Sequence, residues 1–131
     1  MAEIPDERRE RIAEDPFCQK IGVELVALAP GSAETELTVT EELLNFHGTP
    51  HGGAVYSLAD AAFAAASNAD GETALALETN VSYLDAVEVG DTLTATAERE
   101  HESRSTASYR VDVTDDSGAE VAIFRGRVYK P

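Results

Sequence analysis

The 131-residue sequence is poor in cysteine, tryptophan and lysine: it has one cysteine, Cys18, no tryptophan, and lysine only at Lys20 and Lys130. A single cysteine excludes a disulfide within the chain and a zinc site built from several cysteines. No hydrophobic run approaches the roughly 20 residues needed to cross a bilayer, so we expect no membrane association. The 43% of hydrophobic residues suffices for one core, and we expect a single domain over residues 1–131.

Positive charge is scarce as well, because 10 Lys and Arg residues face 25 Asp and Glu residues, which gives a formal net charge of −15. Nucleic-acid binding depends on clustered basic side chains that neutralise phosphates, so we expect no nucleic-acid partner. The N-terminal segment mixes acids with arginines and lacks the apolar stretch of a targeting signal. This pattern predicts a cytoplasmic protein.

The hydrophobic pattern predicts a short solvated helix, then two strands, one long helix and four more strands. Residues 1–15 form a peripheral segment, with the helix at 5–14 and its arginines on the surface. Apolar and polar residues alternate along 32–40, after the Pro30-Gly31 turn, which is typical of a half-buried strand. The remaining strands are expected at 22–28, 73–83, 92–102, 106–114 and 120–129.

The segment 53–68 gives the strongest helix signal, with seven alanines, no proline and apolar or small residues almost all round. Such a helix is buried on most of its circumference. A largely antiparallel sheet must bury one face against an apolar partner, and this helix is the apolar partner that the sequence offers. The sequence therefore predicts an α+β fold in which an antiparallel sheet wraps around one central helix.

One residue of this helix does not suit a buried position. Asp60 lies within the apolar run 58–63, and an unpaired carboxylate in an apolar site costs several kcal/mol. It must therefore be hydrogen-bonded, protonated or exposed to a cleft, and active sites commonly tolerate such a cost. The alternative is a narrow hydrated stripe that Asp60 shares with Tyr56 and Ser67, about one and two helical turns away.

The loop before the helix ends in His51-Gly52-Gly53, where unpaired backbone amides and the positive end of the helix dipole face outward. Glycines there let a ligand carbonyl approach the amides, as an oxyanion site requires. His47 and His51 are four residues apart, but the loop offers no third ligand, so we expect no metal. We assign these histidines to hydrogen bonds that fix the loop, and Asn45 either does the same or holds a water near the site.

Residues at the helix start, along the helix and in the later strands together match a family pattern: Asn45-x5-His51-Gly52-Gly53-x6-Asp60, then Phe63, Asn68, 80–83, 90–95 and 122–126. The pattern resembles that of the hotdog-fold acyl-CoA thioesterases of the phenylacetic-acid-degradation (PaaI-like) type, over residues 15–130. The resemblance implies an acyl-CoA substrate and no separate cofactor. It also implies a homo-oligomer, in which subunits join their sheets and pair again into a dimer of dimers.

By this resemblance, Asp60 acts as nucleophile or general base, and the Gly52 amide polarises the thioester carbonyl. Asn45 and His51 shape the site and place the thioester or a water, and a second subunit completes the site. We expect substrate contacts from five further residues: Gly53, Tyr56, Ser67, Asn80 and Arg104.

The sequence departs from the family pattern after the strand at 73–83. Relatives often carry an Arg-Pro pair there, whereas this chain reads Leu84-Asp85-Ala86-Val87. We therefore expect Arg104 to supply positive charge for the coenzyme A phosphates, with Arg125 and Arg127 as alternatives.

The expected activity is hydrolysis of aryl-acetyl or similar short acyl-CoA thioesters to free acid and coenzyme A. Two alternatives use the same fold. One is a hydratase or dehydratase acting on enoyl or 3-hydroxyacyl thioesters, with His47 or His51 as base. The other is a non-catalytic acyl-CoA-binding protein, which the presence of Asp60 disfavours.

The acidic, lysine-poor and alanine-rich composition resembles that of proteins from salt-in halophiles, where a Debye length of about 3 Å at 1 M salt suppresses self-repulsion. We expect the protein to lose its fold when salt is removed. Thermal unfolding followed by circular dichroism should give a melting temperature that rises steeply from low to molar salt. An unchanged melting temperature would contradict this adaptation.

Overall fold

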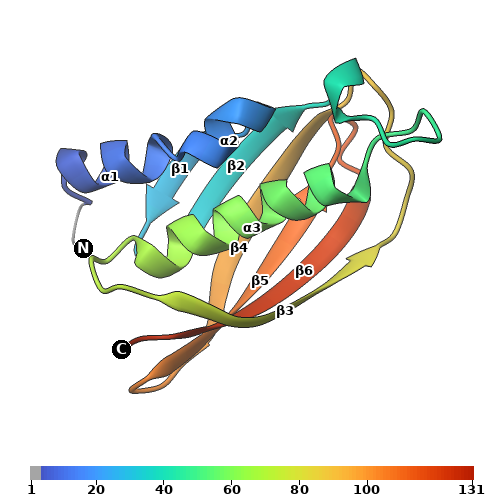
Figure 1. Cartoon of the computed structure of the whole chain (residues 1–131). Helices are drawn as coiled ribbons and strands as arrows, with labels where there is room; N and C mark the ends of the chain where they lie inside the picture. The colour runs from blue at the N-terminus through green and yellow to red at the C-terminus, as the bar shows by residue number, and fades with distance from the viewer. Residues whose placement is uncertain (1–3) are drawn as a thin grey trace.

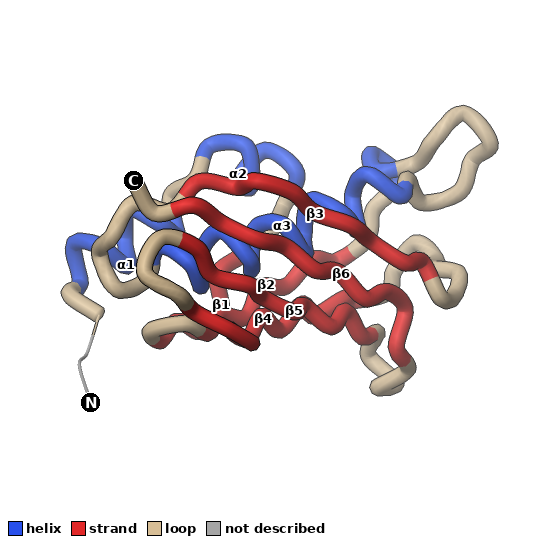
Figure 2. Tube along the Cα trace, turned by 90° about the horizontal axis from the view of Figure 1, so that it is seen from below, coloured by secondary structure: helices blue, strands red, loops and turns tan. Residues whose placement is uncertain are grey.

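The computed structural model describes residues 4–131, and the first three residues of the predicted peripheral segment lie outside the described residues. One antiparallel sheet wraps around the long helix α3, Gly52–Asn68, as the sequence predicted (Figure 1). Viewed from below, the strands form a curved layer with helices behind it (Figure 2). In spatial order the strands are β1 (Glu24–Ala29), β2 (Ser32–Thr38), β4 (Thr92–Glu102), β5 (Thr106–Thr114), β6 (Glu120–Tyr129) and β3 (Leu75–Tyr83).

The face of α3 that points to the sheet carries its large side chains. Phe63 is 1% exposed, and its ring centroid lies 5.7 Å from that of Tyr109 and 5.6 Å from that of Phe124. Gly126 of β6 lies beneath this ring, because a Cβ there would come within 2.6 Å of it. Full burial of a side chain of this size contributes about 1.5–3 kcal/mol. Although α3 is apolar, no helix among the described residues is long and apolar enough to cross a membrane.

The predicted strand pattern is confirmed along β2 and β5. Side chains 33, 35, 37 and 39 are buried, and so are 107, 109, 111 and 113, while their neighbours in sequence are more exposed. By contrast, β3 begins at Leu75, two residues later than expected, and most of its side chains are exposed. The reason is its position, because β3 is an edge strand that pairs with β6 on one side.

The N-terminal region has two helices where the sequence predicted one: α1 (Asp6–Ala13) and α2 (Pro16–Ile21). The second helix was missed. Asp15 caps it by accepting a hydrogen bond from Cys18 N at 3.0 Å, and Pro16 occupies its first position. Gly22, with φ of 90°, ends it and turns the chain into β1. This is a well-formed start and end for so short a helix.

Two arginines of α1, expected on the surface, instead fasten this helix to the body of the protein. Arg8 Nη1 donates to the carbonyl oxygen of Ala69, at the end of α3, over 3.1 Å. Arg9 Nη2 donates to the carbonyl oxygen of Leu28 in β1 over 3.3 Å. The N-terminal helices therefore have a defined position beside α3 and β1.

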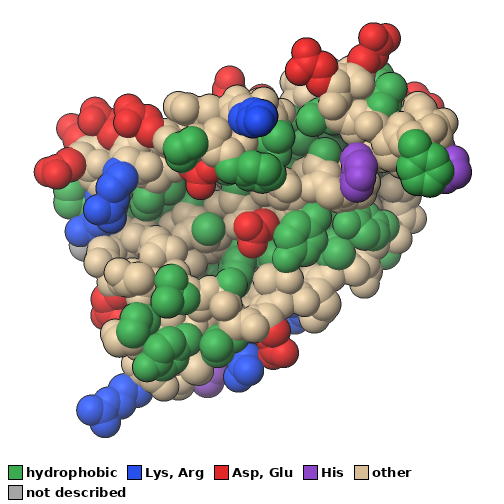
Figure 3. All heavy atoms as spheres, viewed as in Figure 1, with side chains coloured by type: hydrophobic (Ala, Val, Ile, Leu, Met, Phe, Trp, Pro, Cys, Tyr) green, Lys and Arg blue, Asp and Glu red, His purple; other side chains and the backbone are tan. Residues whose placement is uncertain are grey.

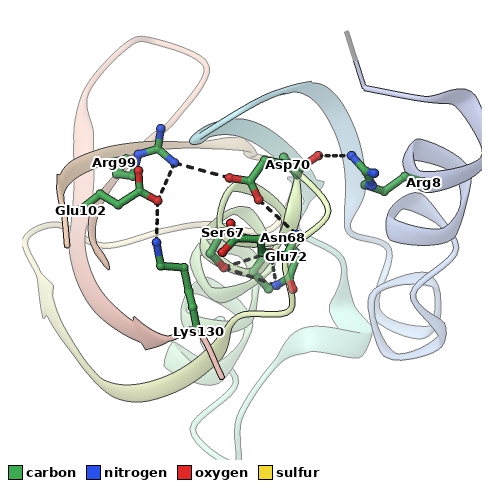
Figure 4. A network of polar contacts seen from close by, with 10 residues as sticks. Arg8, Ser67, Asn68, Asp70, Glu72, Arg99, Glu102 and Lys130 are labelled. Atoms are coloured by element: carbon green, nitrogen blue, oxygen red, sulfur yellow. Dashed lines mark hydrogen bonds and ion pairs between the residues drawn. The ribbon is translucent and has the colours of Figure 1, made fainter. Parts of the chain in front are cut away.

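A polar network surrounds the end of α3 (Figure 4). Arg99 of β4 lies 3.7 Å from Glu102 and 4.0 Å from Asp70, and Lys130 lies 2.8 Å from Glu102. Such partly exposed pairs contribute at most about 1 kcal/mol each. Their effect is to hold the turn after α3 against the ends of β4 and β6, next to the carbonyl that Arg8 contacts.

Candidate active site

The face of α3 turned away from the sheet is lined by small residues and forms one side of a cavity of about 570 Å³. Ser57, Asp60, Ala61, Ala64 and Asn68 occupy positions i, i+3, i+4, i+7 and i+11 of the helix, which places them on one face. The opposite side consists of the N-terminal helices. In Figure 3, hydrophobic and neutral atoms surround this hollowed middle region, while many acidic side chains lie along its upper border.

Asp60 brings the one carboxylate of α3 into this cavity. No donor among residues 4–131 lies within hydrogen-bond distance of it. Burial raises the pKa of this carboxyl above its usual value, and the negative charge of Asp15 on the facing wall raises it further. The sequence left open whether Asp60 is hydrogen-bonded, protonated or exposed to a cleft. In the structure it lies in a cleft, and its loss of solvation is not offset by hydrogen bonds to the carboxylate.

The start of α3 forms a second polar feature. His51 caps the helix, and its Nδ1 accepts a hydrogen bond from Gly53 N at 2.8 Å. Within residues 4–131, the Gly52 amide has no such partner, so it is the glycine N–H available to a ligand oxygen. Gly52 is also where Tyr83 approaches, because its hydroxyl donates to the Gly52 carbonyl oxygen over 3.0 Å.

The cavity beside Asp60 adjoins a smaller one of about 340 Å³ at the helix start. His51 and Gly53 line the smaller cavity, and the two cavities share Phe17 and Ser57. The groove along α3 is thus bounded at one end by the His-Gly-Gly segment and contains Asp60 further along. The structure thus places Asp60 and the His-Gly-Gly segment, both singled out from the sequence, along one groove, and their catalytic roles stay predictions.

Asn45 organises the loop that precedes α3. Its Oδ1 accepts hydrogen bonds from His47 N at 2.9 Å and from Thr49 N at 3.2 Å. The rings of His47 and Phe46 are in contact, with centroids 4.1 Å apart and planes tilted by 38°, and Phe46 itself is 93% exposed. Among the described residues no group of three His, Cys, Asp or Glu side chains is placed to hold a metal ion.

None of the five residues expected to contact substrate lines the Asp60 cavity of its own chain, and Gly53 lines the smaller cavity instead. The Tyr56 hydroxyl is 2.5 Å from Thr79 Oγ1, and Ser67 is buried and donates to the Ala64 carbonyl oxygen. Because Thr79 faces α3, the next residue, Asn80, points to the outer face of the sheet. Arg104 is exposed in the β4–β5 turn.

Other residues that line the cavity were missed from the sequence, among them four of the N-terminal segment: Ile12, Asp15, Phe17 and Cys18. The signal that was available is Asp15-Pro16, a helix-capping residue followed by proline, which marks the start of α2.

A curved antiparallel sheet wrapped around one long alanine-rich helix is the hotdog fold of thioesterases. The chain belongs to the thioesterase superfamily, whose family model matches residues 47–122.

Relatives of known structure agree with this assignment. The chain is 37% identical to the acyl-coenzyme A thioesterase PaaI of Escherichia coli K12, covering 89% of this chain and 84% of that protein. The structure of that PaaI protein matches with a TM-score of 0.91 over 95% of this chain and 91% of that chain, at 34% identity. A mutant form of the phenylacetic acid degradation protein PaaI from Thermus thermophilus matches at 42% identity and a TM-score of 0.85, over 89% of this chain and 100% of that chain.

A more distant structure is that of a hypothetical thioesterase protein from Streptococcus pneumoniae TIGR4 with coenzyme A. It is 26% identical to this chain, with a TM-score of 0.79 over 83% of this chain and 85% of that chain.

The desolvation of Asp60 has a consequence for stability. Because its pKa is raised in the folded state, the folded protein binds this proton more tightly than the unfolded chain does, and stability falls as pH rises through the folded pKa. Asp60→Asn should therefore melt at a higher temperature than the wild type at pH 7. The gain should vanish below the ordinary aspartate pKa of about 3.9.

The matched control is Asp116→Asn, which removes one negative charge from an exposed turn. Thermal melts of the three proteins in molar salt between about pH 3 and pH 8 check the prediction, because this range extends below the ordinary aspartate pKa. Equal gains from both variants would mean that Asp60 is not specifically desolvated.

Proposed function

We propose that this protein hydrolyses acyl-CoA thioesters to a free acid and coenzyme A, with Asp60 as the reacting carboxylate. The observation that carries the proposal is the Asp60 carboxylate, which lies on the small-residue face of α3 that lines the cavity and has no hydrogen-bond donor among residues 4–131. Such a placement costs stability and has no packing benefit, which is typical of a group retained for chemistry. Membership of the thioesterase superfamily and the coenzyme A in a relative's structure support it.

The chemistry follows from what each group can donate or accept. The Gly52 N–H, at the positive end of α3, donates to the thioester oxygen and stabilises the negative charge that develops there. Asp60 then acts in one of two ways. Either it attacks the carbonyl carbon, expelling the coenzyme A thiolate, and water hydrolyses the resulting anhydride, or it takes a proton from a water that attacks directly.

Gly52 and Asp60 of one chain are too far apart to act on one thioester. Eight residues separate them, which corresponds to roughly 12 Å along the helix axis. Groups that act on one carbonyl must each lie about 3 Å from the reacting atoms. The Gly52 amide and the Asp60 carboxylate of one site therefore come from two subunits in this proposal.

In this proposal two subunits join through their edge strands β3. Strand β3 is an open edge with exposed Leu75, Leu77 and Tyr83, and Figure 3 shows hydrophobic side chains gathered along the lower border of the molecule, over β3. Pairing of two such edges covers a surface that otherwise invites aggregation. The tetramer suggested by the family resemblance would add a second contact between such dimers.

The contacts between β3 and α3 give this pairing a register. Tyr83 reaches Gly52 and Thr79 reaches Tyr56, so β3 runs antiparallel to the first half of α3. Two β3 strands paired around Thr79 would set both Tyr56 residues at one level. Gly52 of one subunit would then lie level with Asp60 of its partner, four residues beyond Tyr56 in the opposite direction.

The test is thiol release in molar salt from phenylacetyl-, hydroxyphenylacetyl-, benzoyl- and straight-chain acyl-CoAs. We expect the wild type to turn over aryl-acetyl or short acyl-CoAs, and Asp60→Asn to lose roughly 10²-fold or more in kcat. The exposed variant Asp116→Asn should retain wild-type turnover.

Wild-type turnover by Asp60→Asn would refute the role of Asp60. Loss of the crotonyl-CoA double bond without thiol release would indicate a hydratase, and thioester binding without any turnover would indicate a binding protein. No observation on the histidines favours the hydratase, since His51 Nδ1 is engaged with Gly53 N.

A further inference from the structure

The cavity beside Asp60 has two walls of different origin. Small residues of α3 form one wall, and Ile12, Phe17 and Cys18 of the N-terminal helices form the other. Leu25 of β1 and Thr35 of β2 line it from the sheet side. A volume of about 570 Å³ lies within the range of ligand sites and accommodates more than a water cluster.

The N-terminal wall is held in place at both ends. Arg8 and Arg9 bind backbone carbonyls of α3 and β1, and Ile4 is 7% exposed. At the other end, the Gly22 turn connects α2 to β1, and Val23 N donates to the Cys18 carbonyl oxygen over 2.9 Å. The wall is therefore a built part of the cavity whose shape can discriminate between ligands.

The lining favours an uncharged apolar ligand. Asp15 and Asp60 face the cavity from opposite walls, Glu14 adds a third carboxylate to the lining, and Arg11 is the single basic side chain among the lining residues. A ligand group with its own negative charge would therefore meet a lining of net negative charge. Burial raises the pKa of Cys18 to about 11, so its thiol stays neutral near pH 7 and acts as a small apolar surface.

We propose that this cavity receives the acyl group, that α1 and α2 select its size, and that it takes neutral aryl or branched acyl groups and rejects acyl groups bearing a carboxylate. This inference rests on the proposed hydrolysis. It assigns acyl selection to Cys18, Ile12 and Phe17, which lie outside the motif that carries the family resemblance.

A substitution that fills the cavity tests the size selection. Cys18→Phe should lower the ratio of kcat/KM for phenylacetyl-CoA to that for acetyl-CoA by roughly tenfold or more, because the larger acyl group loses its space. The matched control is Gln19→Phe, the adjacent position on α2, which does not line the cavity and should leave this ratio unchanged. For the wild type, succinyl-CoA should be a far poorer substrate than butyryl-CoA. An unchanged ratio in Cys18→Phe, or equal rates for succinyl- and butyryl-CoA, would overturn the proposal.

A second measurement uses the wild-type protein alone and does not depend on turnover. Cys18 is the single cysteine of the chain, so methyl methanethiosulfonate modifies one site, and mass spectrometry gives its rate. Phenylacetamide, a neutral analogue of the acyl group, should slow this modification several-fold, whereas succinate should not. If no thioester is hydrolysed but phenylacetamide protects Cys18, the proposed hydrolysis fails and the cavity assignment stands. If thioesters are hydrolysed but phenylacetamide gives no protection, the cavity assignment fails.

Discussion

The packing of α3 against the curved sheet is the interaction on which the other features depend. Phe63 and its neighbours fill the concave face of the sheet, and Gly126 leaves the space that this ring requires. The opposite face of the same helix is built from alanine and serine, which leave room for a groove. Because one helix serves both purposes, a group on its outer face has a position fixed by the core beneath it.

The position of Asp60 on this outer face lowers the stability of the folded protein. A carboxylate that is half removed from water and faces a second carboxylate, Asp15, is worse solvated than a surface aspartate. In the proposed hydrolysis, the same loss of solvation makes the ionised form of Asp60 a stronger base or nucleophile towards the thioester. The N-terminal helices supply much of this environment, so a segment that looked peripheral contributes both the wall and the facing charge.

The sequence predicted the fold well because its signals are local and periodic. The alternation along 32–40 and the alanine run at 53–68 gave β2 and α3 nearly to the residue. The helix α2 was missed because six residues carry no periodicity, and the cavity was missed because its walls lie about 40 residues apart in the chain.

The candidate site residues also form two groups: those that lie along the groove and those that lie elsewhere. Asp60, His51, Gly52 and Gly53 lie on or beside the groove as expected, because they belong to one helix and its cap. Tyr56, Ser67, Asn80 and Arg104 point elsewhere in their own chain. The direction of each side chain depends on the face of the helix, the side of the sheet or the turn on which its residue lies. A motif defined by residue types alone does not contain this information.

The central claim is that one site combines the Gly52 amide of one subunit with the Asp60 carboxylate of the other, and complementation between two inactive variants tests it most directly. Gly52→Pro removes the amide hydrogen at a position where proline suits a helix, and Gly52→Ala is its control because it retains the amide. Equimolar refolding of Gly52→Pro with Asp60→Asn gives hybrid dimers that each contain one intact site if the groups come from different subunits. The account predicts recovery of about one quarter of wild-type turnover, since half of the dimers are hybrids with one of two sites intact. A mixture no more active than its inactive parents would contradict it.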